Sequence, residues 1–170
     1  EGSQEGSQEG SQEGSQEGQA EAGSLTVSLS SETSATGTND MVVESTANEY
    51  SEGNISFLTA DFAAGSAAQT VTQIEFRRTG ISNDADLGNL YLYHGDTKLA
   101  ENVSFNDNVV TFRSANGLFT VPAGETHAVT LRGDLARGVV SGGKKMKFTL
   151  TSVSTNGSAT IAEGVTSQEK

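Results

Sequence analysis

The chain has 170 residues, a formal net charge of −12 at pH 7 and no cysteine. The charge argues against a nucleic-acid partner, because polyanions repel one another. Without cysteine there is no disulfide framework and no thiolate metal site. No apolar run approaches the roughly 20 residues that span a bilayer, so we expect no direct membrane insertion.

Residues 1–18 repeat the tetrapeptide Glu-Gly-Ser-Gln and contain no apolar side chain. In a helix, the repeat would place like charges at i and i+4 and a glycine in every turn, and both are unfavourable. We therefore interpret residues 1–23 as a low-complexity leader. Two roles stay open for it: a flexible spacer, or a polar segment held by neighbouring subunits. The sequence begins within the repeat, which we take to indicate a mature product or a piece of a longer chain.

From residue 24 onward, apolar and polar residues alternate as in half-buried strands. Leu25, Val27 and Leu29 begin this pattern. Further strands are expected at 54–62, 71–79, 90–93, 109–113, 118–121, 126–132, 144–153 and 159–162. The residues expected to face inward include Ile74, Phe76, Leu90, Leu92, Met146, Phe148 and Leu150. Eight to ten short strands, with no helical periodicity, predict an all-β, immunoglobulin-like antiparallel sandwich over residues 24–170.

The middle of the chain, residues 52–135, carries a particular order of strands and turns. Its segments are Val71–Gly80, Asn83–Leu87, Leu90–Tyr93, Val121–Gly124 and Thr130–Leu135, with a short strand that ends at Leu99. This order resembles the immunoglobulin-like β-sandwich repeats of large bacterial and archaeal cell-surface and surface-layer-like proteins. The resemblance implies a structural or adhesive role outside the cell. The Glu-Gly-Ser-Gln repeat is not part of that pattern.

We find no constellation typical of an enzyme and expect no catalytic residues. His94 and His127 are far apart and are interpreted as two partly exposed strand residues. No Gly-x-Ser-x-Gly nucleophile elbow occurs. The segment Gly138–Lys145 approaches a phosphate-binding loop, but Lys145 stands where Ser or Thr would bind Mg²⁺. Because a strand rather than a helix follows, we interpret the segment as a glycine-rich hairpin.

Asn83, Asp84 and Asp86 are the best candidate metal ligands, because a hard cation such as Ca²⁺ requires several oxygens in one loop. The alternative is a turn stabilised by Asn and Asp side chains without metal. Further oxygens that other loops would contribute belong to Asn89, Asp96 and Asp107. Calcium is the only cofactor that the sequence indicates.

Tyr91 and Tyr93 share one face of a strand, where they either cap the sheet or contact a sugar or another partner. Asn54, Asn102 and Asn156 each begin an Asn-x-Ser sequon. In a chain this rich in Asn and Ser, the sequons are either glycosylation sites or chance matches.

The segment of Leu25, Val27 and Leu29 is short, alternates cleanly and follows a polar leader. Such a strand suits addition to a neighbouring copy, with apolar side chains in a groove and main-chain hydrogen bonds along a sheet edge. The alternative is that it is the domain's own first strand. We expect a module of an extracellular filament or surface layer whose partners are copies of itself. The competing function is a stand-alone adhesin or carbohydrate-binding module.

Overall fold

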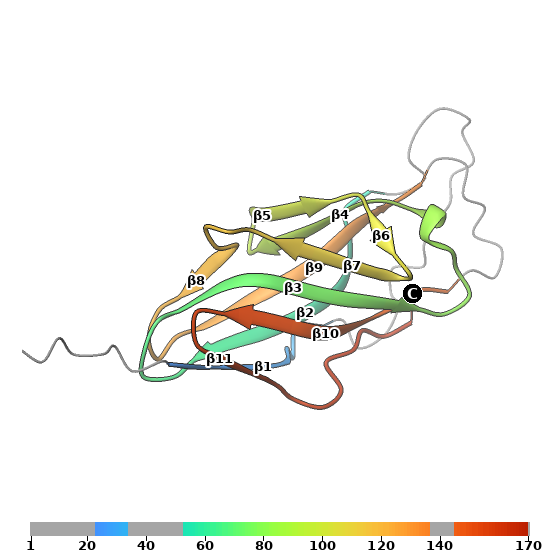
Figure 1. The fold of residues 1–170 in the computed structure, drawn as a ribbon. Helices are drawn as coiled ribbons and strands as arrows, with labels where there is room; N and C mark the ends of the chain where they lie inside the picture. The colour runs from blue at the N-terminus through green and yellow to red at the C-terminus, as the bar shows by residue number, and fades with distance from the viewer. Residues whose placement is uncertain (1–22, 34–52, 137–144, 170) are drawn as a thin grey trace, which may run out of the picture.

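The computed structural model describes residues 23–33, 53–136 and 145–169, and it is a two-layered β-sandwich (Figure 1). The Glu-Gly-Ser-Gln repeat and most of the glycine-rich segment lie outside the described residues. One sheet contains β1 (Ser24–Leu29), β2 (Ile55–Ala64), β4 (Leu87–His94), β5 (Thr97–Asn102), β9 (Thr126–Leu135) and β11 (Ser158–Ile161). The other contains β3 (Gln69–Thr79), β6 (Phe105–Asn106), β7 (Val109–Arg113), β8 (Phe119–Val121) and β10 (Lys147–Thr155).

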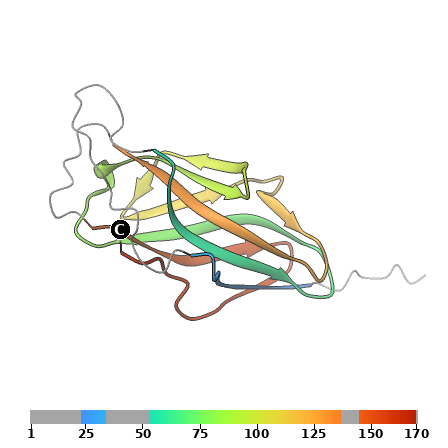
Figure 2. The same cartoon turned by 180° about the vertical axis from the view of Figure 1, so that it is seen from behind.

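The two sheets differ in size, and the chain crosses from one sheet to the other several times (Figure 2). The six-stranded sheet has the order β11-β1-β2-β9-β4-β5, and the second has β10-β3-β7-β6 with β8 also paired to β3. All strand pairs are antiparallel except β1 with β11, which is parallel. A short 3₁₀ helix, Asp84–Asp86, precedes β4, and no helix in the described ranges is long and apolar enough to cross a membrane. The expected all-β sandwich is confirmed.

Alternating side chains from both sheets fill the core. All seven residues expected to face inward are at most 3% exposed: Ile74, Phe76, Leu90, Leu92, Met146, Phe148 and Leu150. Because the chain has no tryptophan, phenylalanine pairs fill much of the space between the layers. Phe57 packs on Phe148 across the sandwich, with ring centroids 4.8 Å apart, and Phe62 packs on Phe119 at 5.3 Å.

Burial departs from a simple alternation of inward and outward residues in β2 and at the end of β1. Phe57 and Leu58 are adjacent, yet both are 2% exposed, because β2 has a bulge opposite β9 at this point. Leu29 is 39% exposed, although its position opposite the buried Ala60 keeps it on the same strand face as Leu25 and Val27. Beyond it, Ser30 is 4% exposed and its N–H donates to the carbonyl of Thr59 over 3.0 Å.

The C-terminal segment covers the edge of the second sheet. The N–H of Leu150 donates to the carbonyl of Val165 over 2.9 Å, and that of Ser167 donates to the carbonyl of Phe148 over 2.7 Å. Val165 is 2% exposed. The backbone of β10 is therefore satisfied on both sides near Phe148 and Leu150, which reduces the open edge available to other chains.

Candidate functional site

The outer face of the six-stranded sheet carries both tyrosines of β4. Tyr91 and Tyr93 are half-buried and lie on the face of β4 that is opposite to the buried face of Leu90 and Leu92, as the alternation of a strand requires. Their rings meet edge to face, with centroids 6.3 Å apart and planes inclined by 70°. The predicted pair therefore forms one aromatic surface.

Cations from the two flanking strands lie over these rings. The Nζ atom of Lys98, on β5, lies 5.4 Å from the centroid of Tyr91. The guanidinium carbon of Arg132, on β9, lies 4.6 Å from the centroid of Tyr93. Both distances fit cation–π contacts. Because a cation already occupies a face of each ring, the pair is less suited to stacking on a sugar than a bare aromatic platform is.

Two carboxylates also lie on this face and contact Tyr91 and Lys98. The hydroxyl of Tyr91 donates to Asp134 Oδ2 over 2.6 Å, and the other oxygen of Asp134 accepts the N–H of Asn54 over 2.7 Å. Burial, helped by this hydrogen bond to Asp134, raises the pKa of Tyr91 to about 12. Lys98 donates to Glu101 over 2.7 Å, and this contact raises the pKa of Lys98. The Tyr91–Tyr93 face thus carries two cations and two carboxylates, of which Lys98 and Glu101 form an ion pair.

Arg132 also lines a hollow of about 210 Å³. Its Nε atom is buried and has no hydrogen-bond partner within the described part of the chain. The other lining residues mix hydroxyl, carboxylate and apolar groups: Glu32, Thr33, Ser56, Phe57, Leu58, Thr59 and Thr130. This volume is below the roughly 300 Å³ at which small-molecule pockets begin. It suits a single side chain or sugar-sized group.

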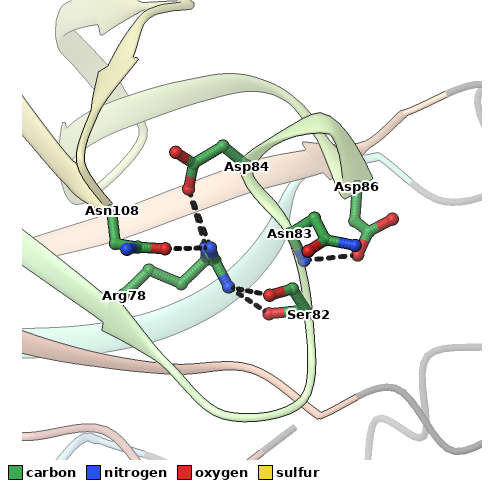
Figure 3. A network of polar contacts seen from close by, with 6 residues as sticks. All are labelled: Arg78, Ser82, Asn83, Asp84, Asp86 and Asn108. Atoms are coloured by element: carbon green, nitrogen blue, oxygen red, sulfur yellow. Dashed lines mark hydrogen bonds and ion pairs between the residues drawn. The ribbon is translucent and has the colours of Figure 1, made fainter.

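The loop expected to bind Ca²⁺ surrounds a buried arginine (Figure 3). Arg78 of β3 is 4% exposed. Its Nε and Nη2 atoms donate to Asp84 Oδ1 over 3.1 and 2.8 Å, and its Nη1 donates to the carbonyl of Ser82 over 2.6 Å. Nη2 also contacts Asn108 Oδ1. A guanidinium cation therefore already binds one carboxylate oxygen of Asp84, whose side chain is 36% exposed.

The three predicted ligands do lie in one turn, as the sequence indicated. The N–H of Asn83 donates to Asp86 Oδ2 over 2.6 Å, and the N–H of Asp86 donates back to the carbonyl of Asn83 over 3.0 Å. The first is a capping-box bond and the second closes the 3₁₀ turn, so both stabilise the turn without a metal. Calcium binding here stays a prediction, and the ion would compete with Arg78 for Asp84.

The additional oxygens are not all near this loop. Asn89 donates to Glu101 on the outer sheet face. Asp96 follows the far end of β4, whose eight residues span roughly 26 Å. Asp107 directly precedes Asn108, a contact of Arg78, so its backbone is close to the loop. The length of β4 thus excludes Asp96 from the predicted set.

The alternation of inward and outward residues along β3 could have identified Arg78 as a buried residue. Ile74 and Phe76 are inward residues of β3, and the next position of the same parity is Arg78. An arginine on a buried face needs a carboxylate and carbonyl partners. The acidic loop a few residues later supplies both.

The predicted contact strand β1 lies within its own domain in this structure. Leu25 and Val27 are fully buried, and β1 pairs with β2 on one side and β11 on the other. Leu29, at the end of the strand, is 39% exposed. Exchange of β1 between copies stays a prediction.

The three sequon asparagines differ in exposure. Asn54 and Asn156 are exposed, whereas Asn102 is half-buried. The Nδ2 of Asn102 donates to the carbonyl of Thr111 over 2.6 Å, a bond that a glycan on the same nitrogen would disturb. If glycans are attached, Asn54 and Asn156 are the better placed acceptors.

The structure brings together the two histidines, which sequence reasoning had kept apart. His94 is opposite Val129 in the β4–β9 register, so His127 is its diagonal neighbour on the same face. The imidazole rings are stacked, with centroids 4.3 Å apart and planes inclined by 19°. Their proximity depends on the register of two strands distant in sequence, which single-strand patterns do not contain.

No protein-family model matches the sequence, and no curated protein matches it either.

Proposed function

We propose that the chain is a non-enzymatic structural module of an extracellular cell-surface assembly, a filament or a surface layer built from its own copies. The observation that carries the proposal is the way β1 is connected. β1 and β2 are antiparallel neighbours, which a loop of two to five residues is enough to join. Residues 30–54 separate them instead, a link of 25 residues (54 − 30 + 1).

The long link leaves β1 free to be supplied by another copy. A link of 25 residues has a maximum reach of about 80 Å. Strand β1 of one copy can therefore occupy the position between β2 and β11 of the next, with identical contacts. Such an exchange has a low cost in free energy because the same interactions form in both arrangements.

The position that β1 occupies provides a strong attachment. Five residues of β1 pair with β2 and four pair with β11, so the strand is bound along both edges. Leu25 and Val27 are fully buried there. Burial of two such side chains contributes about 3–6 kcal/mol, and exchange between copies retains this contribution because the contacts are the same.

A disulfide that locks β1 to its own β2 tests strand exchange. Thr26 and Ala63 are directly opposite in the register and lie on the accessible face, and the chain has no other cysteine. In the Thr26→Cys/Ala63→Cys variant, oxidised as a monomer, we expect electron microscopy and light scattering to show no large particles. Reduction should restore the particles that the parent protein forms.

The matched control places a disulfide elsewhere. Gln73 and Arg113 are opposite each other in β3 and β7, away from β1. The oxidised Gln73→Cys/Arg113→Cys variant should assemble like the parent protein. Assembly by the oxidised β1–β2 variant would show that strand exchange is wrong. A parent protein that remains monomeric at all concentrations would overturn the assembly function itself.

A second candidate function is an adhesin or carbohydrate-binding module. The hollow beside Arg132, with its mixture of hydroxyls and a carboxylate, favours it. This function predicts a monomer with saturable binding to a glycan, and binding that is lost in Tyr93→Ala. The assembly function predicts large particles that form without a glycan.

A further inference from the structure

The chain has two histidines in 170 residues, and the fold stacks them on each other. We infer that His94 and His127, with Glu125, form a binding site for a transition-metal dication, for which Zn²⁺ is the probe. This inference does not depend on the proposed assembly. Imidazole and carboxylate together suit Zn²⁺, Ni²⁺ and Cu²⁺, whereas Ca²⁺ prefers oxygen ligands alone.

The backbone preorganises the two imidazoles. β4 and β9 are paired from Leu87 to His94, so the separation of the two Cβ atoms is set by a continuous sheet rather than by flexible loops. Sites on regular strands hold ligand geometry better than sites on loops. In the stacked arrangement the nitrogen lone pairs of the two rings run nearly parallel, so the rings must rotate out of the stack before two nitrogens can converge on one ion.

Glu125 supplies a third ligand from the turn before β9. Its Oε2 atom lies 3.7 Å from Nε2 of His127. Two ligands bound about 2.0–2.1 Å from a tetrahedral ion are roughly 3.3 Å apart. The observed separation therefore needs to close by only a few tenths of an ångström. A water molecule would complete a site with two histidines and one carboxylate.

The site is accessible at one end of the sandwich. His94 is exposed, and the side chain of His127 is 20% exposed. Within the described ranges, no three such side chains already surround a common point. Binding of one ion by all three side chains thus requires the two rings to rotate and Glu125, whose side chain is 61% exposed, to move toward them. The bound ion would connect β4, β9 and the turn between β8 and β9.

Proton NMR of the full chain during a Zn²⁺ titration tests the site. The chain has only two histidines, so all imidazole C–H signals come from these residues, and His94→Gln and His127→Gln variants assign them. We expect both imidazoles to shift together and to saturate at one equivalent of Zn²⁺. Each variant should weaken Zn²⁺ binding, measured by calorimetry, by about tenfold or more.

Glu125→Gln should weaken binding as well, whereas Glu163→Gln, an exposed carboxylate elsewhere, is the matched control and should not. Far-UV circular dichroism confirms that each variant is folded. A response of one imidazole only would overturn the site. So would Zn²⁺ affinity unchanged in the His94→Gln/His127→Gln double variant, because the ion would then be held by the acidic surface.

Discussion

At the scale of single residues, Arg78 shows what a buried charge requires. Its guanidinium is 4% exposed and is surrounded by oxygens from Asp84, Ser82 and Asn108, three groups of two separate loops. Hydrogen bonds to a carboxylate and to neutral acceptors offset the desolvation of the cation. The arginine therefore connects the loop before β4 to the β6–β7 turn.

Replacement of Arg78 by a small residue should destabilise the fold. We expect Arg78→Ala to lower the free energy of unfolding by about 3 kcal/mol, because partly buried acceptors lose their donors and the buried stem of the side chain is removed. Urea unfolding followed by circular dichroism measures the change. The adjacent Arg77 is exposed, so Arg77→Ala should change stability by less than about 0.5 kcal/mol. Equal effects from the two variants would contradict a central role for the Arg78 contacts.

Tyr91 predicts a loss of stability in alkali. Its pKa is raised to about 12 in the folded chain, against 10.0 for a free tyrosine. Above pH 10.0 the unfolded chain loses this proton while the folded chain keeps it, so the free energy of unfolding falls between pH 10.0 and about 12. Urea midpoints at intervals across this range should fall more in the parent protein than in Tyr91→Phe. A Tyr93→Phe control should keep the parent's dependence.

At the scale of elements, the alternation predicted from the sequence fails where strands are bulged or come to an end. The alternation predicts the buried pairs Ile74 and Phe76 of β3, Leu90 and Leu92 of β4, and Phe148 and Leu150 of β10. It does not anticipate that Leu29, the last residue of β1, is 39% exposed, or that a bulge buries both Phe57 and Leu58. Exposure at a strand end and the position of a bulge depend on which segments are neighbours in the fold.

The C-terminal segment leads to a prediction at this scale. Deletion of residues 163–170 removes Val165 and the backbone partners of Phe148 and Leu150. We expect lower stability, by about 2 kcal/mol for the lost burial of Val165, and association through the uncovered β10 edge. Urea midpoints and light scattering measure the two effects. Deletion of residues 168–170 alone leaves Val165 in place and should cause neither, and association by that shorter deletion would contradict the explanation.

At the scale of the molecule, the sandwich was predictable and the sites were only partly so. Strands with one apolar and one polar face form sheets that must stack in two layers to bury the apolar faces, whatever the order of the strands. The turn of Asn83 to Asp86 and the shared face of Tyr91 and Tyr93 followed from local sequence. The stacking of His94 on His127 and the contact of Arg78 with Asn108 depend on which strands are neighbours, a property of the whole chain.

The parallel pairing of β1 with β11 has a mechanical consequence. The first residue of β1, Ser24, and the last residue of β11, Ile161, lie at opposite ends of the ladder that the two strands share. Tension between them pulls β1 and β11 in opposite directions along their shared ladder, from Ser24–Ser158 to Val27–Ile161. All hydrogen bonds of the ladder are then sheared at once instead of opening one after another, a geometry that resists stretching.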